Sequence, residues 1–169
     1  MYHHVEQRPE WMEMALHGAL FMQQHGRDAE GNWYFSLTAD GRPLVQPYNI
    51  FSDCFATMAF AALDRIQPSD TWKQIAVDTY HNILRRRHNW KGKYNKAVPG
   101  TRPLKNFSLP MILCNLALEL EHVIGSTEVN RLLPEVVHEV MEVFYQPESG
   151  LILELSLIHI SEPTRLGMI

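Results

Sequence analysis

The chain has very few cysteines, no long hydrophobic run and no excess of positive charge. Its 169 residues include two cysteines, Cys54 and Cys114, too few for a disulfide scaffold and typical of reduced thiols. No apolar run approaches the roughly 20 residues that span a bilayer, and the first residues lack the layout of a signal peptide. The formal net charge is −4, which gives no general attraction for nucleic acid or an anionic membrane. These absences predict a soluble, cytoplasmic globular protein without a nucleic-acid or membrane partner.

The common catalytic and cofactor-binding motifs are also missing. The sequence has no glycine-rich phosphate loop, no His-Glu-x-x-His zinc signature and no Cys-x-x-Cys pair, so we expect neither a bound metal nor a cofactor. Histidine is the natural general base near neutral pH, and the chain has nine. Four of them lie singly on separate predicted helices, which favours structural or surface roles: His17, His81, His122 and His138.

Two other clusters allow more than one interpretation. The basic run Arg85–His88 and the lysines after it could bind phosphate, but a helix end whose cations complement the dipole is the better explanation. The aromatic residues Trp33, Tyr34, Phe35 and Trp90 could stack on a sugar ring or form the core of a hairpin. The sequence leaves these two roles equally open.

Hydrophobic residues at helical spacing account for most of the chain. The pattern predicts helices over residues 11–24, 50–63, 70–88, 109–124 and 129–144. Asn49 and Ser69 are candidate N-caps, and Gly125 is placed to end the fourth helix. Pro134 interrupts the last stripe, so we expect a short turn there and a main helix that begins near Pro134.

Two segments are not helical. Residues 33–37 and 44–46 flank Asp40-Gly41, a favoured dipeptide for a hairpin turn. Residues 89–105 contain glycine, proline and several lysines and predict a long loop. A helix, a hairpin and two successive antiparallel helix pairs indicate an all-α architecture, either a bundle or part of an α/α toroid.

The C-terminal residues differ from the rest of the chain. Residues 155–165 read Leu-Ser-Leu-Ile-His-Ile-Ser-Glu-Pro-Thr-Arg, with neither a strand nor a helix period. This string resembles the in-frame translation of a sequencing adapter. We therefore expect residues 1–154 to be a partial domain and residues 155–169 to be a non-native tail, with a natural tail as the alternative.

Polar side chains stand at the start of the second predicted helix. Ser52 and Asp53 follow Phe51 there, where the first backbone N–H groups of a helix have no partner within it. These side chains could point into a cavity beside those groups. Ordinary N-terminal capping explains the same residues, and the composition does not decide between the two.

Several of these segments together carry a family resemblance. Residues 31–35, the turn Asp40-Gly41-Arg42-Pro43 and residues 50–59 resemble the N-acylglucosamine 2-epimerase (renin-binding protein) family. That family has an aromatic strand, an Asp-Gly-Arg-Pro turn and a Phe-Ser-Glu-Cys-Phe helix start in the same order. Leu109–Leu116 is similar to its Val-Pro-Met-Met-Leu-Leu-Asn-Leu helix. The resemblance covers residues 11–154.

The resemblance implies a fold and an activity. The family fold is an α/α barrel of six helix pairs, so this chain is expected to form an incomplete α/α barrel with a small β-hairpin. The implied reaction interconverts N-acetylglucosamine and N-acetylmannosamine by proton transfer at C2 of the open-chain sugar, which requires two bases on opposite faces. The family's two catalytic histidines would follow Glu154 and its early arginine would precede Met1. No catalytic residue is therefore carried over, and the chain is expected to be an inactive fragment.

The residues that can be carried over lie at the expected mouth of the barrel. They are Phe51, Ser52, Asp53 and Asn106, which the resemblance implies bind the sugar. Asp53 replaces the usual glutamate and reaches one methylene less far. Cellobiose 2-epimerases are similar at the Asn106 helix but have histidine where this chain has Pro110, which favours the N-acylglucosamine branch.

The expected partner is a small-molecule sugar, and the full-length protein is expected to form a homodimer. A mannose or other aldose–ketose isomerase on the same barrel is one alternative function. A non-catalytic protein-binding module is another, and a large exposed apolar patch on the full-length protein would favour it.

Overall fold

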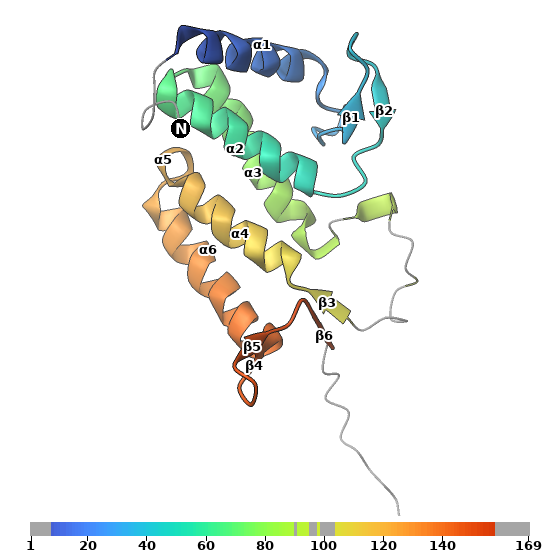
Figure 1. Cartoon of the computed structure of the whole chain (residues 1–169), viewed down its shortest axis with the longest axis vertical. Coiled ribbons are helices and arrows are strands. Elements are labelled where there is room, and N and C mark those ends of the chain that lie inside the picture. The colour runs from blue at the N-terminus through green and yellow to red at the C-terminus, as the bar shows by residue number, and fades with distance from the viewer. Residues whose placement is uncertain (1–7, 90, 95–97, 99–103, 158–169) are drawn as a thin grey trace, which may run out of the picture.

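A computed structural model describes residues 8–89, 91–94, 98 and 104–157. Within them the chain forms six α-helices and six short strands (Figure 1). The helices are α1 Pro9–His25, α2 Phe51–Ile66, α3 Asp70–Arg86, α4 Ser108–Glu119, α5 Glu121–Ile124 and α6 Ser126–Glu139. Shorter helical turns span Arg87–Asn89, Gly92–Tyr94 and Val140–Phe144. The all-α architecture and the order of the predicted helices are confirmed.

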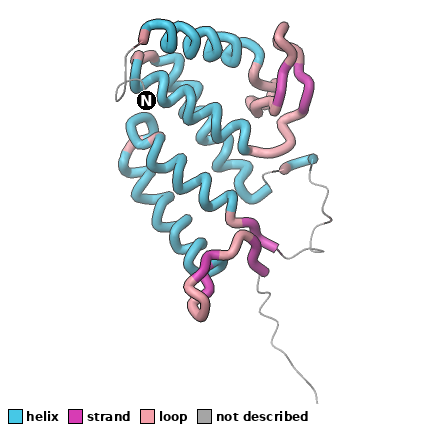
Figure 2. The backbone as a smooth tube through the Cα atoms, in the orientation of Figure 1, coloured by secondary structure: helices cyan, strands magenta, loops and turns pink. Residues whose placement is uncertain are grey.

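The helices are arranged as antiparallel pairs. α2 packs on α3 and α4 packs on α6, while α2 also contacts α4. Figure 2 shows these helices as two neighbouring layers with the strands at their ends. The Thr57 hydroxyl donates a 2.7 Å hydrogen bond to the carbonyl of Ala76, which joins α2 to α3 inside the core. The largest fully buried side chains lie on both pairs and on the segments before and after them: Trp33, Tyr80, Phe144, Ile50, Leu116 and Leu132.

The ends of the helices agree only in part with those predicted from the sequence. The N-cap position of α2 is Ile50, not Asn49 as predicted. The Oδ1 of Asn49 still accepts a 2.9 Å hydrogen bond from the N–H of Phe51, the first residue of the helix. Ser69 occupies the N-cap position of α3, but its side chain makes no capping hydrogen bond. Gly125, at φ +84°, follows the end of α5, although the predicted helix 109–124 is divided at Leu120 into α4 and α5.

The prediction for Pro134 is wrong. α6 begins at Ser126 and runs through Pro134 instead of beginning near it. The proline removes one donor, so the Asn130 carbonyl loses its partner within the helix. Leu132 and Val136, on either side of it, are fully or almost fully buried where α6 packs on α4. Burial of this apolar stripe therefore outweighs the cost of the missing hydrogen bond.

The strands form three two-stranded ribbons. β1 Ser36–Leu37 pairs with β2 Pro43–Val45 in the predicted hairpin, although its first arm is shorter than predicted because residues 33–35 precede the strand. β4 Tyr145–Gln146 pairs with β5 Leu151–Ile152. β3 Leu104–Asn106 pairs with β6 Leu155–Leu157. The segment predicted as a loop therefore ends in a strand, and the tail from residue 158 onward lies outside the described residues.

Candidate functional site

One end of the molecule gathers the segments singled out by the sequence. Figure 1 shows α2 and α4 running in the same direction, with the β1–β2 hairpin and β3 beside their N-terminal ends. The first backbone N–H groups of a helix lack partners within it and carry the positive end of its dipole. The first turns of α2 and α4, the β1–β2 hairpin and β3 together form the mouth. The mouth therefore presents backbone N–H donors from two neighbouring helices.

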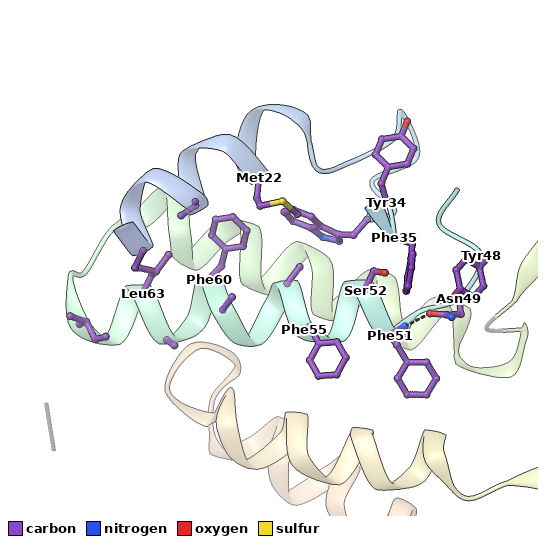
Figure 3. Close-up of a pocket in the computed structure, with 18 residues that line it drawn as sticks. Met22, Tyr34, Phe35, Tyr48, Asn49, Phe51, Ser52, Phe55, Phe60 and Leu63 are labelled. Atoms are coloured by element: carbon purple, nitrogen blue, oxygen red, sulfur yellow. Dashed lines mark hydrogen bonds between the residues drawn. The ribbon is translucent and has the colours of Figure 1, made fainter. Parts of the chain in front are cut away.

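A pocket of about 830 Å³ lies between α1 and α2 (Figure 3). Small side chains line both sides: Ala15, Gly18 and Ala19 on α1, and Ala56, Ala59 and Ala62 on α2. At the mouth the lining becomes aromatic and polar, with Tyr34, Phe35, Tyr48, Asn49, Phe51 and Ser52. The pocket is thus an apolar groove whose few polar groups are at the mouth.

Phe51 and Ser52 both line this groove, so the structure brings together two of the predicted site residues. In Figure 3 the Ser52 side chain points to the α1 side of α2, whereas Phe51 and Phe55 extend on the opposite side. Phe55 is 61% exposed. The two faces of the first turns of α2 therefore differ, one with a hydroxyl and the other with aromatic rings.

Asp53, the next predicted residue, faces the interior instead of the groove. Its side chain is completely buried, and its Oδ1 accepts hydrogen bonds from Arg86 Nη1 at 3.1 Å and from Asn82 Nδ2 at 3.4 Å. Burial raises the pKa of this carboxyl to about 6, although the nearby Arg86 charge opposes the rise. Asp53 is thus a buried anion paired with the last turn of α3.

Asn106 lies at the start of the neighbouring helix pair. Its Oδ1 accepts a 2.7 Å hydrogen bond from the N–H of Ser108, the first residue of α4, and its strand β3 pairs with β6. Asn106 does not line the groove. Its side-chain amide N makes no hydrogen bond among those recorded for the described residues, and it shares the mouth with Phe51 and Ser52 through the parallel arrangement of α2 and α4.

The aromatic cluster divides between the two roles that the sequence left open. Trp33 is fully buried and its Nε1–H donates to Thr79 Oγ1 at 3.1 Å, so it belongs to the core. Phe35 is 57% exposed and its ring lies 5.2 Å from that of Tyr48, centroid to centroid. Trp90 lies outside the described residues. An exposed aromatic pair at the mouth offers a surface suited to the apolar face of a sugar.

Sequence reasoning missed Tyr48 and Asn82, and it interpreted Arg86 only as part of a basic helix end. Tyr48 lies in the segment before α2 and gives no periodic signal. Asn82 and Arg86 are four residues apart on α3, a spacing that places them on one helix face, but nothing in the sequence shows that Asp53 is opposite them. Only the packing of α2 on α3 reveals this cluster.

The histidine of α5 has a structural role. His122 Nε2 lies 2.9 Å from the carbonyl oxygen of Ala61, and its Nδ1 lies 3.0 Å from Arg65 Nη2. Since the Ala61 carbonyl only accepts and the Arg65 guanidinium only donates, the neutral ring carries its proton on Nε2. His122 thereby links the end of α2 to α5.

The described residues contain neither a candidate metal-binding cluster nor a helix that could span a membrane. Among them, no group of three or more histidine, cysteine, aspartate or glutamate side chains is placed to hold a metal ion. None of the helices formed by them has the length and apolar character needed to cross a membrane.

Comparisons with known proteins agree on one family. The sequence model of the N-acylglucosamine 2-epimerase (GlcNAc 2-epimerase) family matches residues 1–159. The N-acylglucosamine 2-epimerases of Bos taurus and Rattus norvegicus are each 31% identical over 116 residues, which is 67% of this chain and 28% of theirs. The chain thus spans under a third of the length of these curated relatives.

Solved structures share the fold at lower identity. A sugar epimerase from a ruminal bacterium superposes with a TM-score of 0.69 at 15% identity, covering 86% of this chain and 41% of that one. Cellobiose 2-epimerase from Bacillus thermoamylovorans B4167 gives 0.68 at 17% identity, covering 92% and 42%. These likenesses show that the helix pairs of this chain are arranged as in part of an epimerase barrel.

Proposed function

The chain belongs to the N-acylglucosamine 2-epimerase family, and from that membership we propose that it forms part of an enzyme that interconverts N-acetylglucosamine and N-acetylmannosamine. The two mammalian relatives named above carry the N-acylglucosamine 2-epimerase name, whereas the solved cellobiose 2-epimerase is only 17% identical. Pro110 is buried at the start of α4. At the similar position, the cellobiose 2-epimerases have histidine. Both observations favour an N-acylated monosaccharide as substrate.

The single observation that carries the proposal is the arrangement of the mouth. The N-terminal turns of α2 and α4 lie side by side, with Ser52 and the aromatic pair Phe35 and Tyr48 lining the groove there. Helix N-termini supply donors to sugar oxygens, and exposed rings supply a face for its C–H groups. We propose that the sugar binds here, in contact with Phe51, Ser52 and Asn106.

Inversion at C2 requires bases that the described residues at the mouth do not supply. The reaction removes the C2 proton on one face of the open-chain sugar and returns a proton on the other, so it requires two bases and donors that stabilise the intermediate oxyanion. Of the described residues at the mouth, Ser52, Asn49 and Asn106 can bind or orient a hydroxyl, but they are not bases near neutrality. We therefore propose that the chain alone is inactive and that the bases belong to other helices of the barrel.

The groove between α1 and α2 supports an incomplete barrel. Its walls carry small side chains on both helices, and α1 makes few close backbone approaches to α2. Helices pack 8–10 Å apart when small side chains meet, so such walls suit another helix better than a polar sugar. We propose that a helix of the same barrel occupies the groove, which leaves the substrate at the mouth. A homodimer and a cytoplasmic location remain predictions for the whole protein.

The experiment that tests the activity uses the longer reading frame that contains this sequence. Incubation with N-acetylmannosamine in D₂O should give N-acetylglucosamine labelled with deuterium at C2, detected by NMR. The 169-residue chain should give no product under the same conditions. Conversion of mannose to a ketose without C2 inversion of N-acetylmannosamine would support the isomerase alternative. If neither sugar changes, the enzymatic proposal fails and the binding-module alternative is favoured.

A further inference from the structure

We propose that Asp53 is a positioning residue, whose buried carboxylate fixes the aromatic segment 33–35 against the first turn of α2. It thereby sets the wall of the mouth beside Ser52 without touching the sugar. The role at the mouth rests on the proposed function, but the positioning itself is a property of this chain.

Burial separates Asp53 from any ligand in the groove. The residue has no exposed surface and does not line the groove, whereas its neighbour Ser52 does. A carboxylate that reaches no solvent cannot accept a hydrogen bond from a bound sugar unless the fold opens. Its contacts must therefore be found within the protein.

Those contacts lead from α2 to the aromatic segment through α3. Arg86 and Asn82 both donate to Asp53 Oδ1. The same Asn82 side-chain N donates to Asn32 Oδ1 at 3.0 Å and lies 3.4 Å from the carbonyl oxygen of Gly31. Asn32 immediately precedes Trp33, so the carboxylate and the aromatic segment share one amide group as their bridge.

The far end of this bridge is also held. Asn32 receives support from Asp28, whose Oδ1 accepts from the Asn32 backbone N–H at 2.8 Å and whose Oδ2 accepts from its side-chain N at 3.0 Å. Beyond Trp33, the N–H of Tyr34 donates to the Gly26 carbonyl at 2.9 Å. The segment is thus fixed on both sides of Trp33, and Asp53 supplies the charge at the centre.

The carboxylate is not fully satisfied. Oδ2 is buried and accepts no hydrogen bond from the described residues. The Trp33 backbone N–H is nevertheless close enough to the carboxylate to lower its pKa. Buried anions with an unfilled acceptor are costly. Protonation of Asp53 removes that cost but weakens the attraction to Arg86 and to the Trp33 N–H, so the segment should respond to pH.

The charged and titratable groups that face Asp53 are few. From α3 they are Arg86 and, through the Asn82 oxygen, Arg85; from α2 the Cys54 thiol is adjacent, and burial raises its pKa to about 12. From the loop before the aromatic segment, Asp28 and Glu30 accept hydrogen bonds from the Asn32 side chain. The raised pKa of Cys54 keeps its thiol protonated between pH 5 and 7.5, so a response in that range is assigned to Asp53.

Backbone hydrogen exchange on the 169-residue chain tests the proposal. Asp53→Asn should raise exchange about tenfold or more in residues 28–35 and the first turn of α2, with little change in α4 and α6. The matched control is Asp64→Asn on the same helix, because Asp64 Oδ1 accepts from the Ser69 N–H at 2.9 Å; it should raise exchange only near residues 66–70. Unchanged exchange in 28–35, or an equal rise in every helix, would overturn the proposal.

A second measurement covers the case in which Asp53→Asn does not fold. In the wild-type chain the indole N–H signal of Trp33, assigned by its loss in Trp33→Phe, should shift between pH 5 and 7.5 with a midpoint near 6. A signal that is constant over that range overturns the proposal. Neither measurement involves a sugar, so failure of the epimerase assay and failure of this inference are separate results.

Discussion

The indole N–H of Trp33 donates a 3.1 Å hydrogen bond to the Thr79 hydroxyl, and both side chains are buried. This bond ties the aromatic segment to the middle of α3, one helical turn before Asn82, which bridges the same segment to Asp53. Two buried polar links on one helix therefore hold the residues that lead to the mouth.

Removing the first link should destabilise the chain. Thr79→Val keeps the shape of the side chain but leaves the Trp33 N–H buried without an acceptor, which costs about 1–3 kcal/mol. Urea denaturation of the variant and the wild type measures this difference. Thr127→Val, at an exposed position of α6, is the control and should change stability by less than about 1 kcal/mol. Equal stability of Thr79→Val and the wild type would contradict the role of the bond.

A glycine after α1 is required by the position of the Trp33 ring. A Cβ added at Gly26 would lie 2.5 Å from the Met22 carbonyl oxygen and 2.5 Å from Trp33 Cζ3. Gly26→Ala should therefore force the buried ring to move and cost about 1–3 kcal/mol of unfolding free energy. Thermal unfolding followed by near-ultraviolet circular dichroism reports both the stability and the tryptophan environment. An unchanged spectrum would show that the ring does not contact Gly26.

Stability should depend on the ionisation of Asp53. Burial raises its pKa to about 6 in the folded chain, from an ordinary value of 3.8, so the folded state binds the proton more tightly than the unfolded state. The resulting stabilisation is fully present below about pH 3.8 and is lost as the pH rises through 6, with a ceiling of about 3 kcal/mol.

Denaturation midpoints at pH 5 and 7 measure this effect. The wild type should gain less stability than Asp53→Asn, or lose more, on going from pH 5 to pH 7, because the amide does not titrate. Other groups contribute equally to both proteins and cancel in the comparison. Parallel pH profiles for the two proteins would refute the assignment.

Gly18 tests what fills the groove. It lies inside α1 and lines the groove, and an added Cβ meets no atom within 4 Å. In the 169-residue chain, Gly18→Ala should stabilise α1 by about 0.5–1 kcal/mol through helix propensity. If a barrel helix packs in the groove, the same substitution in the longer protein should lose this gain or be destabilising. A gain of equal size in both proteins would leave the groove without a helix.

The isolated chain should associate with itself. Large apolar side chains are exposed on both α1 and α2, with Met14 at 74%, Leu20 at 57% and Phe55 at 61% exposure. Exposed apolar surface of this kind is unfavourable in water, so light scattering should show concentration-dependent aggregation of the 169-residue chain. Leu20→Lys should reduce it. A monodisperse wild-type monomer with sharp cooperative unfolding would contradict this prediction.

The parts of the fold that were predictable depend on local signals. The apolar stripe of α4 and the Asp40-Gly41 turn can be recognised from a few neighbouring residues, because helix and hairpin periods arise from backbone geometry. Pro134 was misjudged because its local cost is small beside the burial of Leu132 and Val136 against another helix. Tertiary packing of this kind has no local signature.

At the candidate site, the sequence identified residues within a motif but not the partners that the fold brings to them. Phe51 and Ser52 came from a motif and do line the groove. The distinct orientation of Asp53, one residue later, follows from the 100° rotation between successive helix positions, but its partners Asn82 and Arg86 are about 30 residues away in sequence. A single sequence does not show which buried charges will meet.

The ladder between β3 and β6 also has a consequence for the tail. Its bonds run between main-chain groups, with Asn106 opposite Leu155, and the Phe107 N–H extends the pattern to the Glu154 carbonyl. Such pairing depends on the conformation of the backbone and little on the identity of most side chains. Extended residues of another sequence, without proline, are therefore expected to complete the strand that precedes α4 in the same way.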